Sequence, residues 1–480
     1  SGGVATKELA KNSFEMAYKL DFDKTITEDA LFNYAKLCYE LSFSPFNEAI
    51  SALNDYIGKY SSSPRLDECY KYLVNVYLST KNYKEAMKSI ESMSPPLADE
   101  MKTAYQKIAF MYGLQHYTNN HLQEAIIYLN KSLLYPSNRN FTSLAYYWKG
   151  ESYYQLFEKA GIPFGLDSAI TCYKNFLSSP GAIHNNEFYA ANYNIGYANF
   201  KKENYGEANV WFRKYVGLKS NEPTEKINDA YLRIGDNFFM TKDYSNAADY
   251  YEEALKTGNR DADYAMYQKA VALGVIGKRE AKVKTLVELL TNYVGKSTYE
   301  AAAKYELATT YLQSGNDDNA LAYYKKVVNE HPECSYTSRS LLQIGLVQSK
   351  KKEYDTAIAT LDKVLAVYPK TTEAFEAISA MRDIYRAKSD MDGYEEKLAT
   401  IPYAAVSLAA LDSGNYDVAY DYYDKGDCDN ANKYFMKYIQ KYLDGIFIID
   451  AMYYKAECDY KNKNYDAALG GYQYVIDKPF

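Results

Sequence analysis

The sequence predicts an all-α protein built as a stack of about twelve helix-turn-helix repeats. Small residues return about every 38 positions along the 480 residues, and each is followed four residues later by a bulky apolar side chain. That interval lies in the range where arrays of helical hairpins are found. A composition of 47% apolar and 24% charged residues is typical of a folded chain and not of a disordered one. Each repeat is therefore expected to pack on its neighbours, without one central core.

The repeating small residue is an alanine that marks the second helix of each repeat. The alanines of the series are Ala10, Ala49, Ala86, Ala125, Ala169, Ala208, Ala247, Ala320, Ala357, Ala431 and Ala468. Lys282 and Tyr394 stand at the two places where the series would otherwise skip. Because a small side chain lets two helices approach closely, these positions are expected at the helix crossings.

Residues 190–216 show what each position of a repeat is expected to do. Gly196 belongs to the first helix, Asn204 to the turn, and Ala208 and Phe212 to the second helix. Gly196 and Ala208 are expected to meet at the helix crossing. Phe212, one helical turn beyond Ala208, is expected to fill the space toward the next repeat.

Residues 4–20 have the pattern of a second helix without its first helix, so the chain is expected to begin in mid-repeat. It stops just after another second helix, at residues 471–480, and we expect a fragment of a longer protein. The segment 373–399 has Arg382 and Tyr394 where small residues belong. It predicts a seam between a solenoid section at residues 1–400 and further repeats at residues 401–480, which continue beyond the chain end.

Repeat four carries an insertion near residues 155–166. Gly150 and Ala169 are nineteen residues apart, where twelve is usual, so seven extra residues fall between the two helices. Gly161, Pro163 and Gly165 predict a non-helical excursion that projects from one edge of the stack. Such an insertion marks a binding face or is a tolerated surface loop, and the sequence leaves both open.

The repeat grammar resembles the tetratricopeptide repeat over nearly the whole chain. One unit carries Ile234 and Gly235, then Tyr244, Ala247 and Tyr251, in the order of the family pattern. The resemblance implies a right-handed αα-superhelix whose first helices line a concave groove that binds proteins or peptides. The family period is 34 residues, whereas most intervals here are 37 or 39, so turns or helix ends are expected to be longer.

Two segments, residues 20–50 and 451–476, resemble the large tetratricopeptide proteins of the Bacteroidetes cell envelope. That resemblance implies an exported protein in the periplasm or at the outer membrane. A cytoplasmic location stays open.

Composition and motifs exclude several function classes. The formal net charge is −7 and no basic stripe stands out, so nucleic acid is not an expected partner. No apolar run approaches the roughly 18 residues of a membrane-spanning helix. Phosphate-binding glycine loops, zinc motifs and catalytic constellations are not found, so we expect a protein that is not an enzyme and has no cofactor and no metal. The oligomeric state is left open.

Histidines and cysteines are expected to be structural. His116 and His121 are five residues apart, which on a helix turns them away from each other, and residues 117–120 between them are expected to end the helix. Residues 331–334 offer possible metal ligands but fall in a turn between repeats, so no metal site is expected there. The cysteines at 38, 69, 172, 334, 428 and 458 are too dispersed for a disulfide framework. Only Cys38 with Cys69, and Cys428 with Cys458, are close enough to pair, and we expect buried small side chains instead.

Tyrosine is the compositional outlier, with 55 residues against two tryptophans. Some tyrosines fill bulky packing positions, and others are expected on helix faces outside the hairpin seam. Applying the family register to the first helices predicts an aromatic groove of mixed charge. Its residues are Tyr147, Trp148, Glu151, Tyr193, Asn194, Tyr197, Arg233, Asp236, Tyr264, Tyr267, Tyr305 and Glu306.

Three functions fit this surface. The first is a non-enzymatic interaction scaffold that holds a peptide or a partner protein in the groove, with tyrosines supplying area and polar groups supplying register. The second is a glycan-binding envelope protein that stacks sugars on the same tyrosines. The third is a structural or assembly component of the envelope that uses its edges and ends. The groove tyrosines are equally compatible with a solvated helix face without a ligand.

Overall fold

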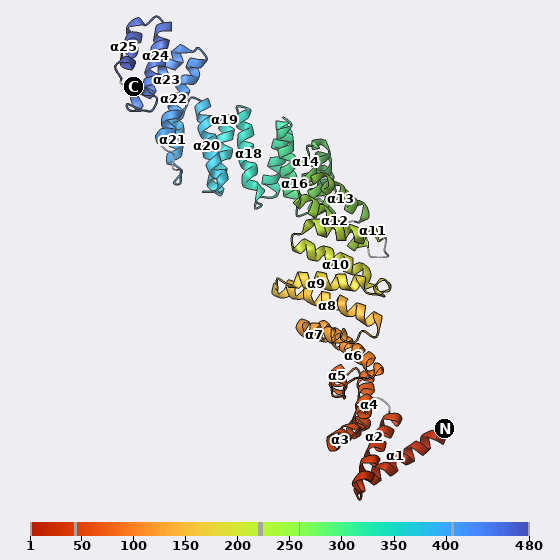
Figure 1. Ribbon diagram of the computed structural model, residues 1–480. Helices are drawn as coiled ribbons and strands as arrows, with labels where there is room; N and C mark the ends of the chain where they lie inside the picture. Colours follow the sequence, from red (N-terminus) through yellow and green to blue (C-terminus); the bar gives the residue numbers. More distant parts are fainter. Residues whose placement is uncertain (1, 43–45, 219–223, 259, 405–407, 479–480) are drawn as a thin grey trace. The chain divides into compact units, whose positions relative to one another are not determined.

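The computed structural model describes residues 2–42, 46–218, 224–258, 260–404 and 408–478 (Figure 1). Within these ranges the chain forms twenty-five α-helices, one 3₁₀-helix and no strand. The all-α prediction is confirmed. By its contacts the chain divides into two compact units, Ser1–Ala265 (unit 1) and Met266–Phe480 (unit 2), and the division falls inside a helix.

The helices of unit 1 are α1 (Gly2–Leu20), α2 (Lys24–Leu41), α3 (Asn47–Lys59), α4 (Leu66–Ser79), α5 (Tyr83–Glu91), α6 (Asp99–Thr118), α7 (Leu122–Ser132), α8 (Arg139–Ala160), α9 (Gly165–Ser178), η1 (Ala182–His184), α10 (Glu187–Lys201), α11 (Tyr205–Gly217), α12 (Thr224–Met240) and α13 (Tyr244–Thr257). Helix α14 (Ala262–Val275) contains the division. Unit 2 continues with α15 (Arg279–Asn292), α16 (Glu300–Gln313), α17 (Asp317–Glu330), α18 (Tyr336–Lys350), α19 (Tyr354–Val367), α20 (Thr372–Ala387), α21 (Met391–Ala399), α22 (Leu408–Asp424), α23 (Cys428–Lys441), α24 (Ile448–Lys461) and α25 (Tyr465–Ile476).

Even-numbered helices are the first helices of the hairpins, and the odd-numbered helix after each is its second helix. Helix α1 precedes them as a second helix packed on α2, as the sequence predicts. Within each unit, helices with substantial contact are first or second neighbours along the chain. That pattern is typical of a solenoid, in which each repeat touches only its neighbours.

The hairpin turns share one local structure. In most of these turns the residue two places before the second helix has a positive φ, for example 64° at Lys242 and 74° at Gly315. Some second helices also have a side-chain cap, as Asp243 and Asn316 accept the N–H of the third residue after them, each at 3.2 Å. Such an N-cap of Asn or Asp satisfies an N–H group that has no partner inside the helix, so these second helices begin at a defined residue. Others, such as α7, α15 and α19, begin without a side-chain cap.

The hairpins close because a bulky side chain of the second helix fills the space left by a glycine of the first. A Cβ atom added at Gly196 would lie 2.8 Å from the Phe212 ring, and one added at Gly235 would lie 2.7 Å from the Tyr251 ring. The series alanines of α3 to α23 are fully buried beside them. Phe212 clusters with Ala230 and Ile234 of the next repeat, as expected, and it also packs on Gly196 within its own hairpin.

The insertion in repeat four is mostly helical, so the predicted non-helical excursion is wrong in extent. Helix α8 continues ten residues past Gly150 and ends at Ala160, where Gly161 with a φ of 63° caps it. Only residues 161–164 lie between α8 and α9. The glycine contact survives the insertion, because a Cβ atom at Gly150 would lie 2.8 Å from the Tyr173 ring.

The two irregular positions of the alanine series keep their packing roles by other means. Lys282 lays its aliphatic chain over Gly274, whose added Cβ atom would lie 2.9 Å from Lys282 Cδ. Tyr394 is buried and donates a hydrogen bond to the Ile378 carbonyl at 3.3 Å. The division between solenoid sections that the sequence places near residue 400 stays a prediction.

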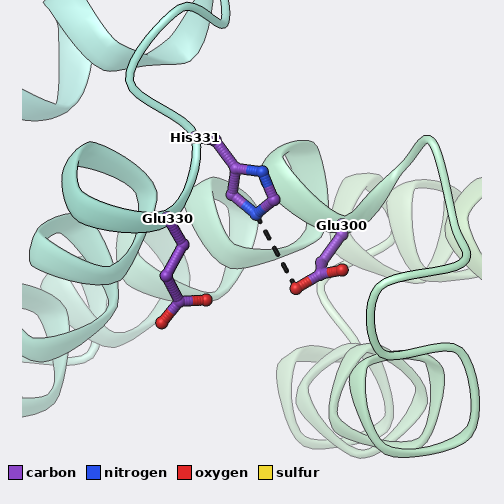
Figure 2. Close-up of side chains that lie close together, drawn as sticks. All are labelled: Glu300, Glu330 and His331. Atoms are coloured by element: carbon purple, nitrogen blue, oxygen red, sulfur yellow. Dashed lines mark ion pairs between the residues drawn. The ribbon is translucent and has the colours of Figure 1, made fainter.

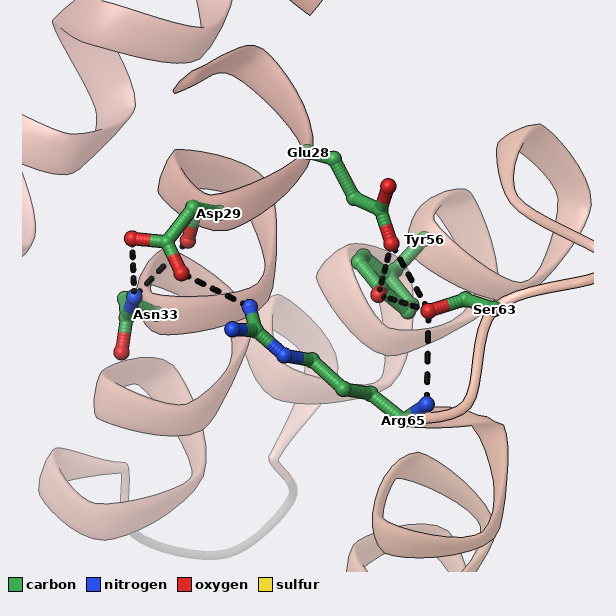
Figure 3. A network of polar contacts seen from close by, with 6 residues as sticks. All are labelled: Glu28, Asp29, Asn33, Tyr56, Ser63 and Arg65. Atoms are coloured by element: carbon green, nitrogen blue, oxygen red, sulfur yellow. Dashed lines mark hydrogen bonds and ion pairs between the residues drawn. The ribbon is translucent and has the colours of Figure 1, made fainter. Parts of the chain in front are cut away.

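Polar contacts join the first helix of one repeat to the start of the next, as in the network of Figure 3. The Tyr56 hydroxyl on α3 and the Ser63 hydroxyl in the following turn both donate to Glu28 on α2, at 2.8 and 2.7 Å. Arg65, just before α4, donates to Asp29 at 2.8 Å. These contacts hold the turn between the second and the next first helix against the preceding hairpin.

The helix crossing gives a stability prediction. Replacing Ala208 by Leu adds volume to a fully buried site and is expected to cost about 1–3 kcal/mol. Gly206→Ala on the same helix is the control, because its Cβ atom meets open space and alanine favours the helix. Thermal unfolding of the full chain followed by circular dichroism measures both. An Ala208→Leu midpoint equal to that of the parent would contradict the assigned register.

Candidate functional site

The twelve predicted groove residues all lie on first helices, and each is buried or half-buried. Nine belong to unit 1, on α8, α10, α12 and the first turn of α14. Three belong to unit 2, on α14 and α16. We call the side chains of α8, α10 and α12 the first-helix face of unit 1.

Glu151 joins two neighbouring repeats of the first-helix face. Its carboxylate accepts a hydrogen bond from the Tyr173 hydroxyl of α9 at 2.9 Å and another from the Asn194 amide of α10. Burial raises the pKa of Glu151, and these donors oppose the rise. Next to it, the centroid of the Tyr147 ring lies 5.3 Å from that of the Trp148 ring and 5.8 Å from that of the Tyr173 ring.

Asp229 connects α10 to α12. The hydroxyls of Tyr193 and Tyr197 both donate to its Oδ2 atom, at 2.6 and 2.5 Å. The two tyrosine rings lie 4.9 Å apart. Burial raises the pKa of Tyr197 to about 12, and the charge of Asp229 adds to the rise.

Asp236, one helical turn beyond Arg233, ends the row in unit 1. Its Oδ1 atom accepts from the Tyr251 hydroxyl at 2.8 Å and from the Tyr264 hydroxyl at 2.7 Å. Arg233 donates to Asp236, and its Nε atom lies 3.5 Å from the Asp229 carboxylate. Burial raises the pKa of Asp236, and the guanidinium opposes the rise.

In unit 2 the three predicted residues are also engaged with neighbours. The Tyr305 ring lies 5.2 Å from the Tyr336 ring of the next first helix. Glu306 accepts from Lys282, the irregular member of the alanine series, at 2.6 Å. Tyr267 is half-buried on α14. The sequence register thus places first-helix residues correctly but does not show that many of their polar groups bond within the chain.

The role of Asp229 and the hydroxyl partners of the buried tyrosines on the second helices were not predicted from the sequence. The sequence does contain a pattern that indicates these partners. Where the bulky residue of the second helix is a tyrosine, the residue that follows the small position of the first helix has a polar side chain that can bond the tyrosine hydroxyl. Glu151 follows Gly150 and Asp236 follows Gly235, and they bond Tyr173 and Tyr251. The further pairs of this kind are Thr309 with Tyr324 and Glu457 with Tyr472. Where the bulky residue is Phe212, which has no hydroxyl, Tyr197 stands at the acceptor position.

Glu300, Glu330 and His331 bring metal-ligating atoms within 4.8 Å of one another (Figure 2). The ammonium of Lys304 occupies this cluster, because it donates to Glu300 at 2.5 Å and to Glu330 and lies 3.1 Å from Nε2 of His331. Although burial alone would raise the pKa of Glu300, Lys304 holds it below its usual value. The group is an internal ion-pair cluster in which lysine takes the place of a cation.

Hollows open on the other side of the hairpins, between consecutive second helices. One of about 320 Å³ lies between α1 and α3 in unit 1. In unit 2, hollows of about 290, 420 and 290 Å³ lie between α15 and α17, between α19 and α21, and between α23 and α25. The last is lined by Met436, Ile439 and Met452 and is the most apolar of these.

His116 and His121 lie close together, and the expectation that they turn away from each other is wrong. Helix α6 ends at Thr118, and Asn120 adopts a φ of 62°, so the chain reverses instead of continuing as a helix. The two ring centroids are 5.7 Å apart as a result. All six cysteines are free, and five of them are buried, which agrees with the expected structural role.

Comparisons with known proteins agree with the repeat geometry. Profiles of the tetratricopeptide repeat match residues 229–257, 299–370 and 450–479. These ranges cover most of α12 and all of α13, the whole of α16 to α19, and most of α24 with all of α25. The outer membrane protein assembly factor BamD of Caulobacter vibrioides is 26% identical over 102 residues, 20% of this chain and 33% of that protein. The chain thus spans about one third of the length of this curated relative.

Two solved structures resemble this chain over about half of its length. The C-terminal part of a TPR repeat-containing protein from Cytophaga hutchinsonii is 18% identical, with 56% of this chain and 98% of that chain covered and a TM-score of 0.44. A tetratricopeptide repeat protein from Parabacteroides merdae is 14% identical, with 52% and 92% covered and a TM-score of 0.35.

The stacked antiparallel hairpins define an α-helical repeat protein of the solenoid class. Tetratricopeptide profiles match hairpins in both units, so the chain contains tetratricopeptide repeats. This fold supports a general role as a protein-interaction scaffold, and proteins built from it are generally non-enzymatic scaffolds. None of the helices that the structure describes has the length and apolarity that a bilayer crossing requires.

The buried tyrosines give a prediction for alkaline pH. Burial raises the pKa of Tyr324 to about 12, above the value of about 10 of an unfolded tyrosine. A group whose pKa is higher in the folded state stabilises it fully below the unfolded pKa, and that contribution is lost as the pH rises through the folded pKa. We therefore expect stability to fall between about pH 10 and pH 12, with a late, cooperative rise of tyrosinate absorbance on unfolding.

The control is the same titration in denaturant, where all tyrosines are expected to ionise near pH 10. The folded protein could instead show the same rise of tyrosinate absorbance with pH as the denatured protein, while circular dichroism shows intact helices. That result would contradict the claim that the hydroxyls are buried.

Proposed function

We propose that the protein is an interaction scaffold that binds an extended peptide segment of a partner protein on the first-helix face of unit 1. The supporting observation is that one row of hydrogen bonds runs from α8 through α10 to α12. It passes through Glu151, Asp229 and Asp236 and fixes the tyrosines bonded to them. Side chains that are already ordered lose less conformational entropy when a partner binds.

The hydrogen bonds of this row favour another role for its polar residues than the ligand register expected from the sequence. Asn194, Arg233 and Asp236 bond within the chain, so they position the aromatic surface instead of setting the register of a ligand. The half-buried rings of Tyr193, Tyr197 and Trp148 then supply the contact area. In the hydrogen-bonded row itself, three carboxylates stand against one guanidinium, that of Arg233, which pairs with two of them. The acidic balance of this row favours a peptide that carries Lys or Arg.

A place in the cell envelope belongs to this proposal. It is supported by the resemblance of residues 20–50 and 451–476 to envelope proteins and by the partial match to an outer membrane protein assembly factor. A glycan ligand on the same tyrosines and a purely structural role are the alternatives, and peptide selection together with a glycan array separates them.

The test is selection of peptides from a random library displayed on phage, with the full chain immobilised. We expect the selected peptides to be rich in Lys or Arg and aromatic residues, and to bind in solution by fluorescence anisotropy. Tyr193→Ala combined with Tyr197→Ala is expected to weaken that binding at least tenfold, because about 1.4 kcal/mol corresponds to tenfold. Asp229→Asn keeps the shape and is expected to weaken basic peptides selectively.

The matched control is Val210→Ala, a half-exposed position on the second helix α11. Its affinity is expected to equal that of the parent, and circular dichroism checks the fold of every variant. Peptides whose affinity falls with Val210→Ala and not with the tyrosine variant would refute the assigned face. Glycan-array hits that require Tyr193, without any peptide selected, would establish the glycan alternative instead.

A further inference from the structure

The turn between α6 and α7 brings two imidazoles together at a fixed separation. The His121 N–H donates to the His116 carbonyl at 2.8 Å, and the positive φ of Asn120 directs the chain back along α6. The ring centroids lie 5.7 Å apart. Because a backbone hydrogen bond joins the two residues, the pairing of their rings follows from the hairpin turn itself.

His116 is held on its other sides by aromatic rings. Its ring lies parallel to that of Tyr128 at 5.3 Å and 4.5 Å from that of Tyr112. Its Nε2 atom is buried and has no hydrogen-bond partner among the described residues. A buried polar atom without a partner is costly and rare in folded proteins.

The separation of the two rings fits coordination of one ion. With Zn–N distances of about 2.0–2.1 Å and tetrahedral angles, two imidazoles on one zinc ion have centroids roughly 5 to 6 Å apart. Glu124 lies in the first turn of α7, three residues after His121, which precedes the helix. The ligating atoms of the three residues do not all lie within 4.8 Å of one another, so Glu124 joins the two rings as a ligand only with a change of rotamer.

We propose that His116, His121 and Glu124 bind a divalent transition-metal ion, with Zn²⁺ as the reference ion. The ion ties the end of α6 to the first turn of α7. Nitrogen and carboxylate ligands suit Zn²⁺, Cu²⁺ and Ni²⁺, and three protein ligands leave a coordination position for water or for a donor from a partner. The site lies outside the proposed peptide surface and stands on separate observations.

The test is isothermal titration of the full chain with zinc chloride at neutral pH. One ion per chain is expected, and the affinity is expected to fall sharply at pH 5.5, where exposed imidazoles are protonated. His121→Ala is the main variant, because His121 is exposed and its removal leaves the helix packing intact. It is expected to weaken binding at least tenfold, and Glu124→Gln is expected to weaken it less.

The controls are His184→Ala, an exposed histidine of η1, and His331→Ala in the ion-pair cluster of unit 2. Both are expected to bind zinc like the parent. The absence of zinc binding in the parent, or an affinity unchanged by His121→Ala, would overturn the proposal. Loss of binding in His331→Ala would place the ion elsewhere and overturn it as well, and an unchanged affinity in Glu124→Gln would remove Glu124 from the ligand set.

Discussion

The structure depends on one packing constraint: in most hairpins a bulky side chain of the second helix occupies space that a small residue of the first helix leaves free. At Gly196, Gly235 and Gly345 an added Cβ atom would lie within 2.8 Å of the bulky side chain sixteen residues later. A larger residue at these glycines would have to displace that side chain or its helix. The interval between the two residues therefore sets the register of the hairpin, and repetition of the hairpin builds the stack.

The same constraint explains part of the tyrosine content. A tyrosine at the bulky position buries its ring and still needs a partner for its hydroxyl, because an unsatisfied buried polar group is costly. The residue after the small first-helix position supplies that partner, as Glu151 does for Tyr173 and Asp236 for Tyr251. These acceptors lie on the first-helix face, so the packing of the hairpins also orders the surface that we assign to the partner.

The sequence predicted what local spacing controls. The alanine series located the hairpins, and the turn at Asn204 and its equivalents located the helix boundaries. It did not predict that α8 runs to Ala160. The glycines and the proline at residues 161–165 indicate a turn, but the strong helix formers at residues 155–160 continue the helix up to them. Five of the seven inserted residues lengthen the helix, and the chain turns only at Gly161.

The candidate sites were harder to predict, because they depend on partners from other helices. Asn194 and Arg233 were correctly placed on first helices, but their bonds to Glu151, Asp229 and Asp236 form only when the repeats stack. The histidine pair depends on one backbone angle at Asn120 that helical spacing does not describe.

The most direct measurement of the packing constraint is a double-mutant cycle between Gly196→Ala and Phe212→Ala, followed by denaturant unfolding of the full chain. Gly196→Ala alone is expected to destabilise the protein, because its Cβ atom would meet the Phe212 ring at 2.8 Å. In the Phe212→Ala background the ring is gone and the same change is expected to cost little, which gives a coupling energy of about 0.5–3 kcal/mol. Additive effects of the two changes would contradict the account.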